Sequence, residues 1–235
     1  MFTQDSLFQA EEFSTSTHAV ATVFFICPYG APIEKVLFAI RRLMKAGYRV
    51  VAYQATAAVF TAADPLILPE LISQVREDIR ARIAKLAAEN VTEFGFFGSS
   101  LGSFILYNCV GKIPELRWGV FNTGGNIAQG MWRMPDLRQL HVARGWSLPR
   151  LEEAWAELQW PDFGRLDGCR FVFVSSRRDD IAPLGNITQY LKPMLDAGAE
   201  VSVRRVPAVS HRTTVIAGLW NAPRFIRMVR HADTG

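Results

Sequence analysis

The sequence contains few cysteines, no long apolar run and no large excess of charge of either sign. Its three cysteines, Cys27, Cys109 and Cys169, are odd in number and lack metal-site spacing, so we expect buried free thiols and a reducing, cytoplasmic compartment. No stretch reaches the roughly 18 apolar residues of a membrane-spanning helix, so no membrane span is expected. Residues 1–13 carry three acidic residues and no basic start before an apolar segment, which argues against a signal peptide.

Signatures of cofactors and of nucleic-acid binding are also missing. The chain has no phosphate-binding glycine loop, dinucleotide fingerprint or metal cluster, so we expect no cofactor and no metal. The net charge is only +4, and the densest basic positions are isolated pairs, namely Arg41-Arg42, Arg177-Arg178 and Arg204-Arg205. We interpret these pairs as solvated faces or ion-pair partners, and a nucleic-acid partner is not expected.

Apolar strand-like runs alternate with helical patterns along most of the chain. Its 235 residues, 49% of them hydrophobic, suit one domain covering residues 1–235. The alternation predicts an α/β fold with a mostly parallel sheet and helices on both faces. The expected strands are 20–27, 48–53, 94–97, 116–121, 171–174 and 200–206, and the expected helices are 33–46, 69–90, 184–197 and 213–231.

Residues 126–167 break this alternation, because they contain no convincing strand. The segment holds four of the six tryptophans: Trp132, Trp146, Trp155 and Trp160. We interpret it as an inserted helical cap over an active site, in which Trp132, Trp146 and Trp155 bind substrate because tryptophan offers a large apolar surface. The alternative is a packing unit far from any pocket.

The pentapeptide Gly98-Ser99-Ser100-Leu101-Gly102 lies between the apolar run 94–97 and a helical pattern. In a strand–turn–helix context, G-x-S-x-G is typical of a sharp turn that exposes the central serine above the sheet. The turn strains the backbone of the central residue, so small residues are needed two positions before and after it. Ser100 is therefore a candidate nucleophile. The alternative is a glycine- and serine-rich turn without chemistry.

A serine nucleophile near neutral pH needs a base, and the base needs an orienting carboxylate. Of the four histidines, only His211 follows an expected core strand, although a residue there could equally begin a helix. Asp179 and Asp180 directly follow the expected strand 171–174 and its short extension. Either aspartate could orient the histidine while the other caps the helix that begins near Pro183.

The order Ser100, Asp179, His211 resembles that of the α/β-hydrolase superfamily, and the resemblance covers the chain from about Val20 to its end. In many relatives the acid lies four residues before a proline. That position is held here by Asp179, which is thereby favoured over Asp180. The resemblance also implies a trimmed sheet of six or seven strands, because too few residues precede Val20 for the full leading hairpin.

The resemblance implies an oxyanion hole built from backbone N–H groups. One belongs to the residue after the nucleophile, Leu101, and the other to the loop Cys27-Pro28-Tyr29-Gly30. Many relatives have His-Gly where this chain has Cys27-Pro28. Because proline has no N–H, Tyr29 is the expected second donor and Gly30 the alternative.

These residues together predict a serine hydrolase, most simply a carboxylesterase, that cleaves a small-molecule ester through an acyl-enzyme on Ser100. A thioesterase, an acyltransferase or a carbon–carbon bond hydrolase would use the same residues. A non-catalytic binding protein of the same fold is a further alternative. The natural substrate and the oligomeric state stay open.

Overall fold

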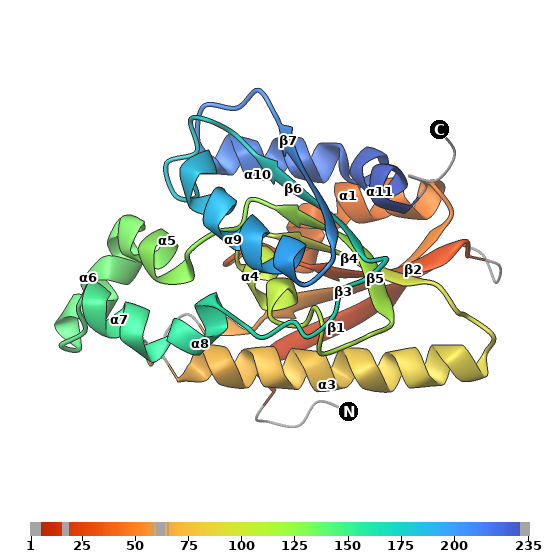
Figure 1. The fold of residues 1–235 in the computed structure, drawn as a ribbon, viewed down its shortest axis with the longest axis horizontal. Helices are drawn as coiled ribbons and strands as arrows, with labels where there is room; N and C mark the ends of the chain where they lie inside the picture. Colours follow the sequence, from red (N-terminus) through yellow and green to blue (C-terminus); the bar gives the residue numbers. More distant parts are fainter. Residues whose placement is uncertain (1–5, 16–18, 58, 60–63, 65, 231–235) are drawn as a thin grey trace.

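A seven-stranded sheet forms the centre of the computed structural model, which describes residues 6–15, 19–57, 59, 64 and 66–230 (Figure 1). The strand order is β1-β3-β2-β4-β5-β6-β7, and every neighbouring pair is parallel except β1 with β3. The predicted α/β class and mostly parallel sheet are confirmed. The strands are β1 (Phe8–Phe13), β2 (Ala21–Ile26), β3 (Tyr48–Ala55), β4 (Phe94–Ser99), β5 (Leu116–Asn122), β6 (Arg170–Ser175) and β7 (Glu200–Arg205).

Strand β1 is the element that the sequence analysis missed. It pairs antiparallel with β3 at the edge of the sheet, and none of its residues is fully buried. The central strands β2 and β4, in contrast, are buried at every position. A central parallel strand needs apolar residues on both faces, which makes it easy to recognise, whereas an edge strand tolerates polar residues such as Glu11 and Glu12.

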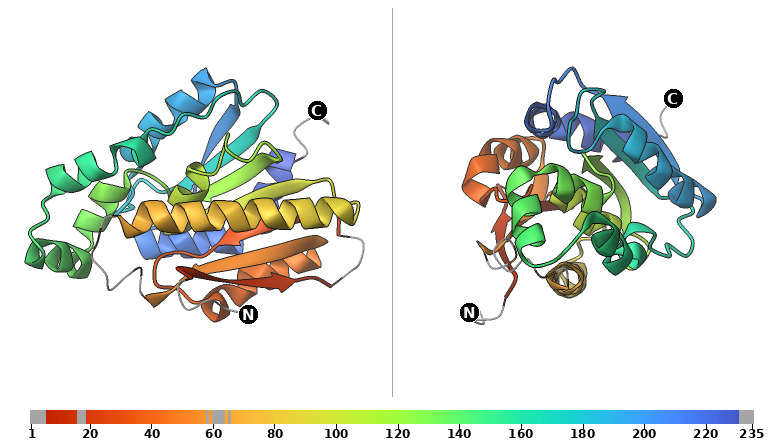
Figure 2. Two further views of the ribbon diagram at one scale, coloured as in Figure 1. Left: turned by 90° about the horizontal axis from the view of Figure 1, so that it is seen from below. Right: turned by 90° about the vertical axis from the view of Figure 1, so that its left-hand side faces the viewer.

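Helices cover both faces of the sheet (Figure 2). On one face, the buried side chains of α1 (Ile33–Lys45), α10 (His211–Trp220) and α11 (Ala222–Arg230) pack together. On the other face lie α3 (Ile67–Ala88), α4 (Leu101–Tyr107) and α9 (Leu184–Asp196). The expected helix 213–231 is therefore two helices, α10 and α11. The break falls at Asn221, two residues before Pro223, whose missing N–H favours the first turn of a new helix.

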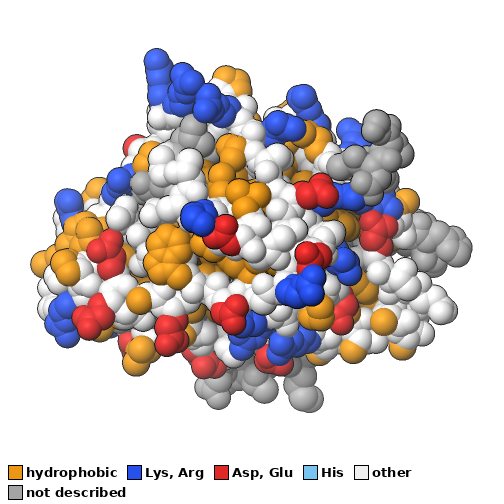
Figure 3. Space-filling model, viewed as in Figure 1, with side chains coloured by type: hydrophobic (Ala, Val, Ile, Leu, Met, Phe, Trp, Pro, Cys, Tyr) orange, Lys and Arg blue, Asp and Glu red, His pale blue; other side chains and the backbone are white. Residues whose placement is uncertain are grey.

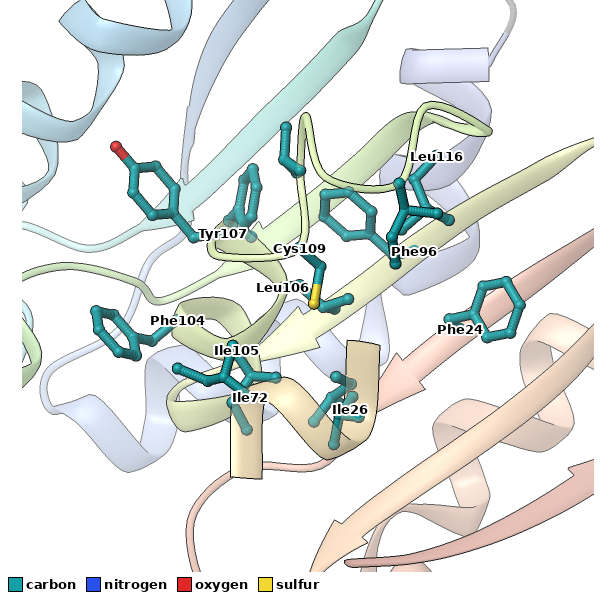
Figure 4. Packing of buried hydrophobic residues seen from close by; sticks show 14 of the residues in the cluster. Phe24, Ile26, Ile72, Phe96, Phe104, Ile105, Leu106, Tyr107, Cys109 and Leu116 are labelled. Carbon is teal, nitrogen blue, oxygen red and sulfur yellow. The ribbon is translucent and has the colours of Figure 1, made fainter. Parts of the chain in front are cut away.

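Helix α3 shows how the sequence pattern becomes packing. Its buried residues recur every three or four positions, and burying each large apolar side chain contributes roughly 1.5–3 kcal/mol. Figure 4 shows part of this core, with Ile72 of α3, Ile105 of α4 and Phe96 of β4. The opposite side of α3 carries acidic and basic side chains in alternation (Figure 3). The apolar stripe comprises Leu68, Leu71, Ile72, Val75, Ile79, Ile83 and Leu86.

The insertion is helical, as expected. It consists of α5 (Ile127–Arg133), α6 (Pro135–Ala143), α7 (Leu148–Ala154) and α8 (Ala156–Gln159). These helices gather at one end of the molecule, beyond the carboxyl ends of the central strands (Figures 1 and 2). Within the described ranges, no helix combines the length and the apolar character needed to cross a membrane.

One arginine pair and a member of another, separate in sequence, come together in space. Arg177, Arg178 and Arg205 line one surface groove, which is formed by the loops after β6 and β7. In Figure 3, Lys and Arg side chains gather at the top of the molecule, over these loops. Arginines from pairs that are isolated in the sequence are thus neighbours in space, because parallel neighbouring strands bring their carboxyl ends to the same edge of the sheet.

Candidate active site

The turn between β4 and α4 holds Ser100 in an unusual backbone conformation. Its φ of +54° and ψ of −115° lie in a region that side-chain-bearing residues rarely adopt and that costs about 1–3 kcal/mol. The backbone N–H of Ser100 donates a hydrogen bond of 2.8 Å to the carbonyl oxygen of Asn122, at the end of the neighbouring strand β5. The adjacent elements therefore hold the strained residue in place.

The two glycines of the pentapeptide are required by close backbone contacts. A Cβ atom on Gly98 would lie 2.5 Å from the carbonyl oxygen of Gly102, and one on Gly102 would lie 2.2 Å from that of Ile26. Both distances are far shorter than a real carbon–oxygen contact. The spacing G-x-S-x-G thus follows from the packing of α4 against the ends of β4 and β2.

Ser100, His211 and Asp179 lie in a hydrogen-bonded series. The Oγ of Ser100 is 2.9 Å from Nε2 of His211. The Nδ1 of the same ring is 3.0 Å from Oδ1 and 3.1 Å from Oδ2 of Asp179. With the proton on Nδ1, the ring donates to the carboxylate and leaves Nε2 free to accept the serine proton. The structure therefore brings together the three residues that the sequence analysis selected.

The two adjacent aspartates make different contacts. The carboxylate of Asp179 is fully buried, and its Oδ1 also accepts hydrogen bonds from the backbone N–H groups of Ile181 and Ala182 at 3.0 and 2.7 Å. Asp180 instead accepts a hydrogen bond of 2.8 Å from the backbone N–H of His211. One aspartate thus contacts the imidazole, and the other holds the first residue of α10 rather than capping the helix after Pro183.

A pocket of about 440 Å³, its open mouth included, lies beside Ser100 and His211. Tyr29 and Leu101, the expected oxyanion donors, both line it, whereas Gly30 is not part of its lining as the described residues form it. Most of its remaining wall is apolar or backbone. This wall consists of Phe104, Thr123, Gly124, Gly125, Asn126, Ile127, Gly130, Met131, Met134, Ile181 and Ala182. We call this cavity the Ser100 pocket.

The structure places none of the three tryptophans beside Ser100, although Trp155 lines a neighbouring cavity. None of Trp132, Trp146 and Trp155 belongs to the lining of the Ser100 pocket in the part of the chain that the structure describes. Trp155 is only 2% exposed and belongs to the core, while Trp132 and Trp146 pack against that core. A small helical insertion needs large side chains for its own packing, and tryptophan provides the largest apolar area.

The insertion contacts the pocket through its first helix instead. Ile127 and Met131 of α5, with Met134 just after it, supply apolar side chains to the wall. Because α5 follows the carboxyl end of β5 after only a short loop, its position in the chain was a signal that sequence analysis could have used. Methionine is flexible and adapts to irregular apolar surfaces, so it suits such a wall.

Asn122 is a further residue that sequence analysis missed. Its side-chain Nδ2 donates to Oγ of Ser99 at 2.9 Å and to the backbone carbonyl of Val215 at 3.0 Å. Asn122 thereby connects the turn that carries Ser100 with α10, the helix that begins at His211. The signal in the sequence was a polar residue at the end of an apolar strand. A polar side chain that is buried there is expected to form hydrogen bonds.

Burial changes the titration of groups around the pocket. Burial raises the pKa of the Cys27 thiol to about 12, so this thiol stays protonated and is a poor nucleophile. Burial, with a smaller contribution from the charge of Asp136, raises the pKa of Tyr29. Across the described residues, no group of three or more histidine, cysteine, aspartate or glutamate side chains is arranged to hold a metal ion.

The chain matches no known protein-family model, and no curated protein is detectably similar to it in sequence. Solved structures do match. An esterase from Pyrococcus furiosus is 15% identical with a TM-score of 0.62, and the match covers 95% of this chain and 91% of that one. A lipase in its open form is 15% identical with a TM-score of 0.68 over 95% of both chains.

A 2,6-dihydroxy-pseudo-oxynicotine hydrolase is 13% identical with a TM-score of 0.67, and the match covers 96% of this chain and 64% of that one. Likeness at this level of sequence identity establishes a shared architecture. The chain has the fold of the α/β-hydrolase superfamily.

Proposed function

We propose that the protein is a serine esterase that hydrolyses small-molecule carboxylic esters. Ser100 is the nucleophile, His211 the general base and Asp179 the carboxylate that orients the imidazole. The observation that carries this proposal is the series of contacts from Ser100 to His211 at 2.9 Å and from His211 to Asp179 at 3.0 Å, at the wall of a largely apolar pocket.

In the first half of the reaction, Oγ of Ser100 attacks the ester carbonyl while Nε2 of His211 takes the serine proton. Negative charge then develops on the carbonyl oxygen, and the backbone N–H groups of Leu101 and Tyr29 are the proposed donors to it. Removing one such donor typically costs about 3–4 kcal/mol of transition-state stabilisation. The protonated imidazole gives its proton to the departing alcohol, which leaves an acyl group on Ser100. Water, deprotonated by His211, then releases the acid.

The insertion, residues 126–167, is proposed to act as a cap on the Ser100 pocket within a single domain, residues 1–235. Its support is the apolar wall that Ile127, Met131 and Met134 supply beside Ser100. The three cysteines are buried and free, which is consistent with the proposed cytoplasmic location.

Aryl esters of increasing acyl chain length test the proposed activity. The wild type should hydrolyse 4-nitrophenyl acetate, and His211→Ala should abolish this turnover. Val142→Ala is a control that changes an exposed side chain of the insertion and should keep it. The same three residues would also serve a thioesterase, an acyltransferase or a carbon–carbon bond hydrolase, so the panel includes acyl thioesters, an added alcohol acceptor and a β-diketone. If none of the oxygen esters is turned over while one of these substrates is, the proposed ester specificity is wrong.

A further inference from the structure

A second cavity lies next to the Ser100 pocket, beneath the insertion. It has a volume of about 370 Å³, its open mouth included, and shares two wall residues, Tyr29 and Met131, with the Ser100 pocket. Its other walls come from the start of α3 and from the helices of the insertion, and they include Leu137, Leu140 and Trp155. We call it the cap cavity. Tyr29 and Met131 therefore lie at the boundary between the two cavities.

His141 is the unusual member of these walls. It lies in the last turn of α6, is only 4% exposed, and lines the cap cavity beside Trp155, whose ring centre is 6.4 Å away. Its Nδ1 is buried and has no hydrogen-bond partner among the described residues. A buried polar atom without a partner is costly, and most such atoms in native proteins are paired.

The imidazole of His141 is a neutral hydrogen-bonding group. Burial, aided by the nearby charge of Arg144, lowers its pKa, so the ring is uncharged at neutral pH. A neutral imidazole carries one N–H donor and one acceptor nitrogen. Asp64 also lines the cavity, but its side chain is exposed and its Oδ1 accepts from the backbone N–H of Leu66. Among the described residues that line the cavity, His141 alone has a buried side-chain polar atom without a hydrogen-bond partner.

We propose that the cap cavity is a specificity subsite for a hydroxyl group carried by the substrate away from its scissile ester, and that His141 binds this hydroxyl. The proposal rests on the proposed esterase function. A hydroxyl both donates and accepts, so it pairs with either nitrogen of the ring. An unsubstituted alkyl chain would fill the cavity but leave His141 without a partner, and sites built around such a polar group reject the analogue that lacks it.

Matched ester pairs test the subsite. Each pair consists of 4-nitrophenyl esters of equal chain length, one ending in a hydroxyl and one in a methyl group, and a second series places the hydroxyl on the alcohol of an acetate ester. At the chain length that reaches His141 in one of the two series, the wild type should favour the hydroxyl ester by about fivefold in kcat/KM. His141→Leu, which keeps an apolar side chain of similar size, should lose this preference.

Two further variants control the experiment. His141→Asn keeps a polar atom near the position of Nδ1 and should retain part of the preference. Val142→Ala changes an exposed neighbour on the same helix and should leave the preference intact. Turnover of 4-nitrophenyl acetate, which is too short to reach the cavity, should be the same in Val142→Ala as in the wild type, and it is the reference rate against which each protein's preference is expressed.

The outcomes separate this subsite from the proposed function. If acetate is hydrolysed but the wild type shows no preference for a hydroxyl at any length in either series, the subsite proposal is wrong and the esterase stands. The subsite proposal is also wrong if His141→Leu keeps the preference for the hydroxyl ester. Should His141→Leu fail to fold, the absence of this preference from both the wild type and His141→Asn would lead to the same conclusion. If no ester is turned over at all, the esterase proposal fails, and the subsite proposal falls with it.

Discussion

The carboxylate of Asp180 accepts a hydrogen bond of 2.8 Å from the backbone N–H of His211, the residue whose ring contacts the neighbouring Asp179. One loop after β6 therefore fixes both the backbone and the imidazole of His211. Asp179 acts on the ring from a fully buried position, whereas the bond from Asp180 forms at the exposed start of α10. This difference in burial separates the expected effects of changing the two residues.

Asp179→Asn should lower kcat by about 10⁴-fold, because an asparagine amide favours the wrong tautomer of the histidine. Asp180→Ala removes one partly solvated hydrogen bond, worth about 0.5–1.5 kcal/mol, and should lower kcat by no more than about tenfold. Steady-state hydrolysis of 4-nitrophenyl acetate measures both effects. Equal losses of kcat would contradict the assignment of the imidazole to Asp179 and of the His211 backbone to Asp180.

The turn around Ser100 should not tolerate a methyl group at Gly102. Gly102→Ala places a Cβ 2.2 Å from the carbonyl oxygen of Ile26 and should lower the free energy of unfolding by about 1–3 kcal/mol or more. Gly185→Ala is the control, because a Cβ there meets no atom within 4 Å. That variant should be unchanged or up to about 1 kcal/mol more stable. Urea unfolding compares the two, and a Gly102→Ala protein as stable as the wild type would contradict the packing described here.

Asn122→Ala should destabilise the protein and disturb the alignment of Ser100 with His211. It leaves the hydroxyl of Ser99 and the carbonyl of Val215 without their shared donor, at a cost of about 1–3 kcal/mol. Asn221→Ala, which removes only a local bond to the carbonyl of Ala217, should cost less. Urea unfolding gives the stability, and the rate of serine acylation gives the alignment. If Asn221→Ala lowers the free energy of unfolding as much as Asn122→Ala does, the two hydrogen bonds of Asn122 are no more stabilising than a local one.

Acidification should destabilise the wild type partly through His141. Its pKa is lower in the folded protein than in the unfolded chain, so the unfolded chain binds the extra proton more readily. The stability due to the neutral buried ring is therefore complete above the unfolded pKa, near 6.5, and is lost as the pH falls through the folded value. Urea unfolding at pH 7.5 and 5.5 should show a smaller acid-induced loss in His141→Leu than in the wild type. An identical loss in both proteins would exclude this contribution.

The core strands of the fold were predictable because burial on both faces leaves an unambiguous apolar run. Strands β2 to β7 fall at the predicted places, with ends that differ by at most two residues. Edge strand β1 lacks such a run, and the division between α10 and α11 depends on the local effect of Pro223. Composition within one short window identifies the central strands, whereas edge strand β1 depends on its pairing with β3.

The candidate site was partly predictable for a similar reason. Ser100, Asp179 and His211 each follow a recognisable strand, and parallel strands bring such positions to one edge of the sheet. For the insertion, the short loop between β5 and α5 was the one comparable signal, and it pointed to α5 as a whole. Which side chains form the wall, and where the tryptophans lie, became visible only in three dimensions.

Covalent labelling with a fluorophosphonate tests the role of Ser100 most directly, because the reagent modifies only an activated serine. Intact-mass and peptide measurements should show one label per chain, on the peptide that contains Ser100, in the wild type and in Ser99→Ala. Ser100→Ala should show neither label nor ester turnover while keeping the thermal stability of a folded protein. A Ser100→Ala protein that is still labelled and active, with Ser99→Ala inactive, would contradict the account.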